Sequence, residues 1–298
     1  MTCALFHSLD HAVIAVRDLA AAAEGYAALL GRPPSWRGVH PGVGTANALF
    51  RLENTYLELL APEGEGALGR RIADVIAEQG EGLVALAFGT DDAEVCARRL
   101  RAAGLAVREP SEGEGRDVES AARRRWCNVL LAPDATRGLW LFAIEHLDAA
   151  DALTPREPAT APAAAVAALD HVVVASADLE ASRSLYGAGL GLRLALDRSF
   201  EARGLRILFF RVGGVTVEVV GQLKRVPGEP GAAPEPSKHD RFGGLAWRVP
   251  DVEAAGERLV AAGFDVSEVR PGAKPGTRVC TVRRETWGVP TLLISPAA

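Results

Sequence analysis

The chain contains 298 residues, 48% of them hydrophobic and 24% charged, and it carries a net charge of −5. This composition excludes a chain that is disordered throughout, and at roughly 150 residues a domain it predicts two globular domains. The negative charge argues against nucleic-acid binding, which requires a basic face. No stretch approaches the roughly 18 consecutive apolar residues of a membrane helix, so we expect no membrane span.

The four cysteines, Cys3, Cys96, Cys127 and Cys280, form no CxxC pair. A secreted disulfide framework has denser cysteine spacing than this. Residues 1–8 show no basic stretch followed by a long apolar run, so no signal peptide is predicted. We therefore expect reduced thiols and a cytoplasmic protein.

The segment that ends at Gly31 predicts a strand followed by a helix. Apolar residues alternate from His11 onward, which is the period of a half-buried strand. Asp18 follows, and its side chain can cap a helix by accepting from unpaired backbone N–H groups. Gly31 is placed to end that helix in a left-handed conformation. Short strands are expected next, at residues 46–52 and 55–60.

The same pattern restarts later in the first half. Residues 69–80 have the spacing of an amphipathic helix, and residues 86–92 alternate as a strand. Asp92 then precedes a helical pattern that closes near Gly104. A unit of strand, helix and two or three strands is therefore repeated within this half.

A stronger repeat relates the two halves. Residues 9–31 and 169–191 are identical at 12 of 23 positions without a gap, and both begin with Leu-Asp-His. Residues 86–107 and 245–266 align at nearly the same offset. Two blocks at nearly one offset indicate a duplicated domain. We place the four modules near residues 8–61, 83–146, 168–221 and 242–296.

The domain boundaries follow from this repeat. We predict a first domain at residues 1–147, a Pro-containing linker at 148–166 and a second domain at 167–298. A long Pro- and Gly-rich loop is expected at 222–240. Closed dimers are common, but four modules can already complete two cups, so a monomer and a homodimer both remain open.

Paired modules with Leu-Asp-His on the first strand and a glutamate on the last resemble the vicinal-oxygen-chelate superfamily. This superfamily includes glyoxalase I, extradiol dioxygenases, fosfomycin-resistance enzymes and bleomycin-binding proteins. Residues 40–62 (HPGVGTANALFRLENTYLELLAP) are similar to a narrower glyoxalase-like group. The resemblance implies an α+β fold of four βαβββ modules, the glyoxalase/bleomycin resistance/dihydroxybiphenyl dioxygenase fold, whose sheets curl into cups.

The resemblance also implies a divalent ion in the cup, held by the first and last strands of each module. Fe, Mn, Ni, Co or Zn would suit imidazole and carboxylate ligands and leave positions for an oxygen-bearing substrate. The matching residues are His11 and Glu58 in the first half, and His171 and Glu218 in the second. The corresponding positions of the even modules hold no ligand: Ala85, Phe142, Gly244 and Leu292.

One histidine and one glutamate in each half are too few for a tight site, because catalytic metal centres usually have three protein ligands. Three arrangements remain open. His40 completes the first site, or substrate and water complete it, or modules one and three share a cleft that unites all four ligands. Without a metal, the histidines bond within the cup, and Glu58 and Glu218 pair with them as buried carboxylates.

Further candidates surround the first cup. His40 precedes Pro-Gly and is expected on a turn, where it is either a catalytic residue beside Glu58 or a turn-stabilising side chain. Thr45 and Asn47 have the same strand parity and lie among small apolar residues, so they either contact substrate or bond within the core.

Aromatic and basic residues offer two further interpretations. Trp126 and Trp140, with Trp247 and Trp287 in the second half, form either a wall for a flat ligand or part of the core. Residues 123–125, all arginine, either attract an anionic substrate or form a solvated strand edge.

Two functions from different classes follow. The first is an enzyme of the glyoxalase or dioxygenase type, a lyase, isomerase or dioxygenase that acts on a small oxygen-rich molecule through a weakly held divalent metal. Glu58 and His40 are its catalytic candidates. The second is a metal-free protein that binds a small molecule in the same cup, as antibiotic-sequestering relatives do. A third possibility is that one half is active and the other is a structural relic.

Overall fold

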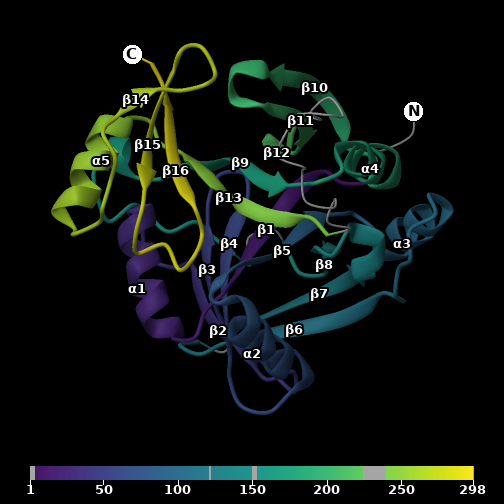
Figure 1. Cartoon of the computed structure of the whole chain (residues 1–298). Coiled ribbons are helices and arrows are strands. Elements are labelled where there is room, and N and C mark those ends of the chain that lie inside the picture. The colour runs from purple at the N-terminus through teal and green to yellow at the C-terminus, as the bar shows by residue number, and fades with distance from the viewer. Residues whose placement is uncertain (1–3, 121, 150–152, 224–238, 298) are drawn as a thin grey trace.

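The computed structural model describes residues 4–120, 122–149, 153–223 and 239–297. Cys3 and residues 224–238 of the expected long loop lie outside this range, as do residues 150–152 of the expected linker. The described chain forms two sheets of eight strands each, one from each half of the sequence (Figure 1). The architecture is the α+β fold of tandem modules that the sequence predicts. None of the described helices has the length and apolar character needed to cross a bilayer.

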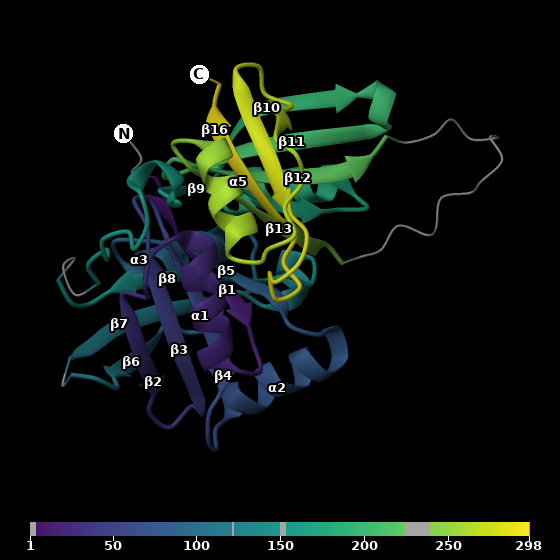
Figure 2. The ribbon, with the colours of Figure 1, turned by 90° about the vertical axis from the view of Figure 1, so that its left-hand side faces the viewer.

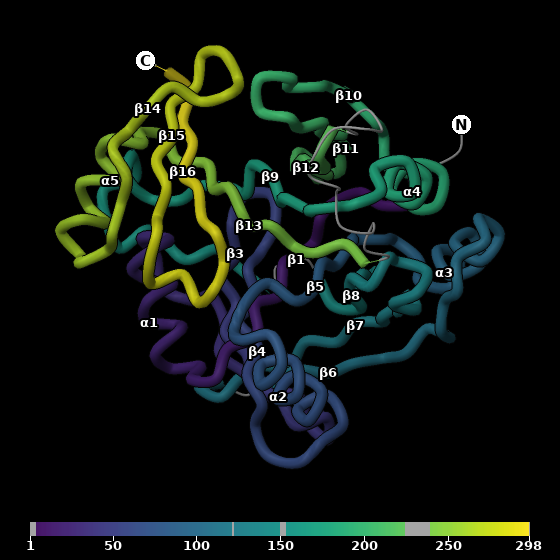
Figure 3. Tube along the Cα trace, in the orientation of Figure 1, coloured from purple at the N-terminus to yellow at the C-terminus, as the bar shows by residue number. Residues whose placement is uncertain are grey.

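The first half closes into a barrel with the strand order β1-β4-β3-β2-β6-β7-β8-β5. Its elements are β1 (Ser8–Ala15), α1 (Leu19–Leu30), β2 (Trp36–His40), β3 (Thr45–Arg51), β4 (Tyr56–Pro62), α2 (Ala67–Gln79), β5 (Gly82–Gly89), α3 (Ala93–Ala102), β6 (Ser111–Asp117), β7 (Arg123–Leu130), η1 (Pro133–Thr136) and β8 (Trp140–His146). The tube in Figure 3 follows these strands around the barrel, with α2 lying against β4.

The second half forms an open sheet with the order β10-β11-β12-β9-β13-β16-β15-β14. Its elements are η3 (Pro162–Ala164), β9 (Ala168–Ala175), α4 (Leu179–Ser184), η4 (Leu185–Gly189), β10 (Arg193–Phe200), η5 (Glu201–Arg203), β11 (Leu205–Val212), β12 (Val215–Gln222), β13 (Arg241–Arg248), α5 (Val252–Ala261), β14 (Arg270–Pro271), β15 (Thr277–Val282) and β16 (Thr291–Pro296).

Each module helix begins at an aspartate, as the sequence predicts at two of these positions. The Asp18 carboxylate accepts from the backbone N–H of Ala21, and Asp92, Asp178 and Asp251 cap their helices in the same way. These bonds satisfy N–H groups that have no partner within the helix. The cap therefore fixes where each strand turns into its helix, and so which strand residues face inward.

The strand registers confirm the equivalences expected between modules. In each module, we consider the first-strand residue two positions after the histidine, or after the residue that replaces the histidine. It pairs with the last-strand residue at the glutamate position. These four pairs are Val13 with Glu58, Ala87 with Phe142, Val173 with Glu218 and Ala246 with Leu292. The apolar replacements thus stand where the resemblance places metal ligands in the even modules.

The two halves pack against each other through one continuous core. The rings of Tyr26 in α1 and Trp287 in the second half lie 5.3 Å apart, and the Arg258 guanidinium of α5 donates to the carbonyl of Leu29. Figure 2 shows α1 and α5 adjacent where the barrel meets the open sheet. Trp247 is 1% exposed within this core. The aromatic-wall interpretation of Trp247 and Trp287 is therefore wrong.

Candidate active site

The barrel of the first half encloses a cavity of about 340 Å³, within the usual range for a small-molecule site. In the closed eight-stranded order, β4 lies four strands from β7 and therefore across the barrel from it. Module one, with β1 to β4, supplies a polar wall, and module two, with β5 to β8, supplies an aromatic and apolar wall. All the candidate site residues predicted in the first half except Thr45 line this cavity: His11, His40, Asn47, Glu58, Trp126 and Trp140.

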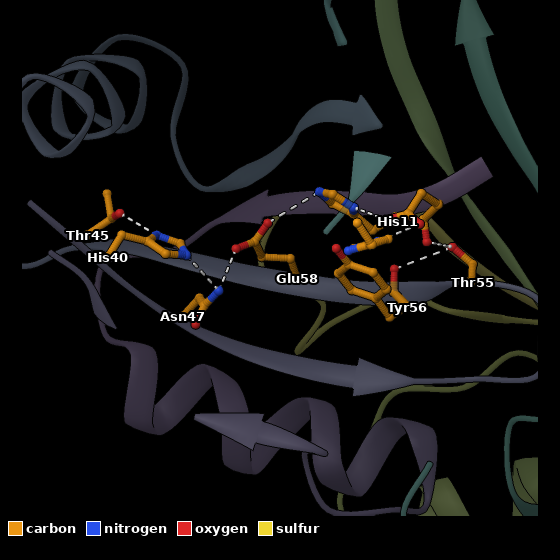
Figure 4. A network of polar contacts seen from close by, with 9 residues as sticks. His11, His40, Thr45, Asn47, Thr55, Tyr56 and Glu58 are labelled. Atoms are coloured by element: carbon orange, nitrogen blue, oxygen red, sulfur yellow. Dashed lines mark hydrogen bonds and ion pairs between the residues drawn. The ribbon is translucent and has the colours of Figure 1, made fainter. Parts of the chain in front are cut away.

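A continuous series of polar contacts runs along the module-one wall (Figure 4). His11 Nε2 lies 3.5 Å from Glu58 Oε2, so the predicted imidazole and carboxylate do meet inside the barrel. Asn47 Nδ2 donates to Glu58 Oε1 at 2.7 Å and lies 3.1 Å from His40 Nε2. Glu58 is 9% exposed, and both of its oxygens have a polar neighbour.

His40 is the last residue of β2 rather than part of a free turn, so the expectation of a turn position is corrected. Strand β2 was not among the strands expected from the sequence. It places the His40 imidazole in the cavity wall. His40 Nδ1 lies 2.8 Å from Thr45 Oγ1. Because Asn47 offers an N–H to Nε2, the network assigns the ring proton to Nδ1, which donates to Thr45. Burial, with the charges of Arg124 and His11, lowers the pKa of His40 against the opposing effect of Glu58.

Asp10 holds the other side of His11. Its Oδ1 lies 2.7 Å from His11 Nδ1, and its Oδ2 lies 3.0 Å from His146 Nε2. Burial alone would raise the pKa of Asp10, but the hydrogen bonds and charges of the two histidines hold it far below its usual value. The Tyr56 ring stacks on His11 at 4.5 Å. His11 is thus fixed in orientation, with Nε2 directed at Glu58.

The opposite wall is built around two tryptophans. A Cβ atom on Gly113 would lie 2.4 Å from Trp126 Nε1, so the glycine leaves room for the indole to cross β6. The Arg71 guanidinium lies 4.2 Å from the Trp140 ring centroid. Phe142 faces the cavity and packs edge-on against His11 at 5.5 Å. The wall predicted for the first half is therefore present.

Arg124 lies in the cavity wall, unlike the two arginines beside it. Arg123 and Arg125 are exposed, as a solvated edge predicts, but Arg124 is 7% exposed and lines the cavity. The signal was available in strand parity, because Arg124 lies two residues before the inward-facing Trp126. Of the two interpretations of residues 123–125, the solvated strand edge is wrong at Arg124.

Both halves of the chain match known protein families. The model of the family described as "Glyoxalase-like domain" matches residues 9–168, more than half of the chain. The chain belongs to this family. Residues 170–281 match the family described as "Glyoxalase/Bleomycin resistance protein/Dioxygenase superfamily", so both halves of this glyoxalase-like protein lie within the vicinal-oxygen-chelate superfamily. No curated protein matches the chain.

Three solved structures share the fold over most of the glyoxalase-like chain. A variant of 4-hydroxymandelate synthase from Streptomyces coelicolor is 17% identical, with a TM-score of 0.69 over 98% of this chain and 94% of that one. A hypothetical protein from Staphylococcus aureus is 12% identical, with a TM-score of 0.61 over 95% and 97%. A xylose isomerase-like TIM barrel/4-hydroxyphenylpyruvate dioxygenase fusion protein is 14% identical, with a TM-score of 0.61 over 98% and 49%. At these identities the likeness is one of fold.

The second half of this glyoxalase-like protein keeps a separate His–Glu pair. His171 Nδ1 lies 2.9 Å from Asp170 Oδ1 and 3.9 Å from Glu218 Oε1. Burial lowers the pKa of His171, but the hydrogen bond to Asp170 and the carboxylate charges outweigh it and raise the pKa. Burial raises the pKa of Glu218. These residues belong to the open sheet and do not line the barrel cavity, so the arrangement in which modules one and three share a cleft is wrong.

The donor set of the first cup does not fit a resident metal ion. Across the described ranges, no three His, Cys, Asp or Glu side chains gather in a way that could hold an ion. His11 and Glu58 provide two donors, and Ala85 and Phe142 occupy the other register positions. His40 Nε2 is already engaged by Asn47, which links it to Glu58, so His40 is not a third ligand. Three protein ligands are the usual minimum in catalytic centres.

Proposed function

We propose that the protein is an enzyme that moves a proton on a small oxygen-bearing molecule held in the first-half cup, with Glu58 as the proton acceptor. The single observation that supports this is the oriented, buried carboxylate. Asn47 fixes Oε1, and Oε2 faces His11 and the cavity. A carboxylate in such surroundings is costly to keep without a functional or structural reason, and general bases are held in this way.

The chemistry that this arrangement supports is proton abstraction next to a carbonyl group. Glu58 takes the proton as the substrate C–H bond breaks, and the bonding electrons move onto the carbonyl oxygen as an enolate. The His11 ring, whose Nδ1–H is donated to Asp10, lies beside Glu58 and can donate from Nε2 to that oxygen in its doubly protonated form. Return of the proton to the neighbouring carbon gives an isomer, and return to the same carbon gives exchange with solvent, so no redox partner is required.

The experiment is solvent-deuterium exchange followed by proton NMR. Pyruvate, hydroxyacetone, dihydroxyacetone and phenylpyruvate are incubated with protein in D2O, and the loss of each signal from C–H next to the carbonyl is timed. We expect the protein to accelerate exchange of at least one compound, and Glu58→Gln to slow it by about 10²- to 10⁴-fold. Glu218→Gln is the matched control, because Glu218 has the same register position in the other sheet and is expected to leave the rate unchanged.

A second candidate is a binding protein without catalysis. The observation that favours it is the aromatic wall of Trp126, Trp140 and Phe142, which offers apolar area to a flat ligand. If none of the four compounds exchanges faster than in buffer, or if Glu58→Gln exchanges as fast as wild type, the catalytic proposal fails. Tight binding of aromatic ligands that is insensitive to Glu58→Gln would then support the binding role.

A further inference from the structure

Arg124 carries a positive charge into the interior of the barrel. Its neighbours Arg123 and Arg125 on β7 are exposed, whereas Arg124 is 7% exposed and faces the cavity. Strand β7 lies across the barrel from β4, the strand that holds Glu58. The Arg124 side chain reaches far enough across to contact the Tyr56 ring on β4, 5.5 Å from the guanidinium carbon to the ring centroid.

The partners of this guanidinium are aromatic. Its central carbon lies 5.7 Å from the ring centroid of Trp36, in addition to the contact with the Tyr56 ring. Within the part of the chain that the structure describes, Arg124 has no carboxylate within ion-pair distance. Arg137 is a useful contrast, because this half-buried arginine is paired with the buried Asp240 at 3.0 Å. A buried cation that faces a cavity without a carboxylate partner leaves the charge to be balanced by what enters the cavity.

Several carboxylates near Arg124 are engaged by other groups, and Glu114 of β6 is paired with Arg116. Both oxygens of Asp10 are engaged, one by His11 and one by His146. Glu58 is held by His11 and Asn47. Arg124 therefore contacts aromatic rings of the module-one wall but forms no ion pair with Glu58 or Asp10.

We propose that Arg124 binds the anionic group of the molecule that occupies the cup, which makes that molecule a small organic acid. The planar guanidinium presents parallel N–H donors that match the two oxygens of a carboxylate. An acid bound in this way places its body against the Trp126 wall and its far end toward Glu58. This inference rests on the proposed use of the cup as a substrate site and adds the class of substrate.

The test is charge-selective binding, measured by isothermal titration calorimetry. The probes are three acids with their neutral amides of nearly equal shape: benzoate and benzamide, phenylacetate and phenylacetamide, and 3-phenylpropanoate and 3-phenylpropanamide. In wild type we expect at least one acid to bind about tenfold to a hundredfold more tightly than its amide. Arg124→Gln is expected to remove this difference, and Arg124→Lys to keep part of it because the charge remains without the planar fork.

Arg123→Gln is the matched control, since it makes the same charge change one residue away on the outer face of β7 and is expected to retain the selectivity. The inference is overturned if no acid is preferred over its amide in wild type, or if the preference survives in folded Arg124→Gln. Glu58→Gln separates this inference from the proposed catalysis. If Glu58→Gln loses deuterium exchange but still prefers acids to amides, both the catalytic proposal and the Arg124 inference are supported. If wild type prefers acids but shows no exchange, only the Arg124 inference is supported.

Discussion

Glu58 and Glu218 occupy the same register position in their two sheets, but their neighbours differ. Glu58 pairs with Leu49 across β3 and β4, and Glu218 pairs with Phe209 across β11 and β12. Two residues before these partners stand Asn47 in the first half and Ile207 in the second. The amide that holds Glu58 is therefore replaced by an apolar side chain beside Glu218.

The same comparison extends along the polar wall. His40 pairs with Thr45 in the first half, and Phe200 pairs with Leu205 at the matching place in the second. Both sheets thus keep a His–Glu pair after the duplication. The contacts that connect Glu58 through Asn47 to His40 occur only in the barrel of the first half. This difference supports a division of labour in which the first half holds the active site.

Because the first cup offers two metal donors, we expect it to bind a divalent metal weakly. One substitution should strengthen this binding. Ala85 lines the cavity at the register position where the odd module has His11. Wild type loaded with Co²⁺ or Zn²⁺ and then gel-filtered should retain well below one equivalent, because it offers two donors. Ala85→His adds a second imidazole, and thus a third donor, and should bind Co²⁺ with visible d–d absorption.

The control for this prediction is Ala85→His combined with Glu58→Gln, which should lose the added affinity. A full equivalent of metal in wild type that disappears in Glu58→Ala would show that the two-donor argument is wrong. Metal content is measured by elemental mass spectrometry, so this test does not depend on a substrate.

Sequence alone predicted the features that depend on local chemistry and on repetition. The resemblance to the vicinal-oxygen-chelate superfamily placed His11 and Glu58 on the first and last strands of one module, and these adjacent strands bring the two side chains to 3.5 Å. Parity also placed Trp126 and Asn47 in the cup. The repeat predicted four modules because each must bury one face of its sheet against a neighbour.

The remaining features depend on contacts between distant strands. Closure of the first barrel rests on two residue pairs between β2 and β6, Gly38 with Asp117 and Val39 with Arg116, and no sequence period marks these pairs. The second sheet, with similar modules, stays open. Parity placed Arg124 on the same face of β7 as Trp126, but its contacts with Trp36 and Tyr56 on other strands depend on closure of the barrel.

His40 and His171 are expected to change stability with pH in opposite directions. The pKa of His40 is lowered in the folded protein, chiefly by burial, so the unfolded chain binds a proton more readily. Its contribution to stability therefore falls as pH drops below the unfolded value of about 6.5. The pKa of His171 is raised, so its contribution is fully present below that value and is lost as pH rises through the folded pKa.

The measurement is the free energy of unfolding by urea between pH 5 and 9 for wild type, His40→Gln and His171→Gln. The difference between wild type and His40→Gln should grow with pH, and the difference for His171→Gln should shrink. Slopes of the same sign in both variants would contradict the assigned environments of the two imidazoles.

Gly113 and Gly115 provide a matched pair for testing the Trp126 wall. A Cβ on Gly113 would meet the indole Nε1 at 2.4 Å, whereas one on Gly115 would meet the same ring at 3.4 Å. Gly113→Ala should therefore displace the indole, at a cost of about 1–3 kcal/mol in the free energy of unfolding. Gly115→Ala should cost less. The benzoate affinity of Gly113→Ala should also fall, and unchanged affinity and stability would remove Trp126 from the wall.

The last prediction concerns the join between the two halves. Asp240 accepts from Arg137 Nε at 3.0 Å and from Ser182 Oγ at 2.8 Å, and its side chain has no exposed area. Arg137 belongs to the first half and the other two to the second, so this buried carboxylate links the barrel to the open sheet. Asp240→Asn leaves the guanidinium without its charge partner and should reduce the free energy of unfolding by about 3–5 kcal/mol.

The exposed pair of Glu253 and Arg278 is the control, because Glu253→Gln should cost less than about 1 kcal/mol. If the Asp240 contact holds the halves together, Asp240→Asn should also make the first half more sensitive to limited proteolysis near its η1 segment. Equal stability losses in the two variants would mean that the buried carboxylate contributes no more than a surface ion pair, and that apolar packing around Tyr26 and Trp287 alone joins the halves.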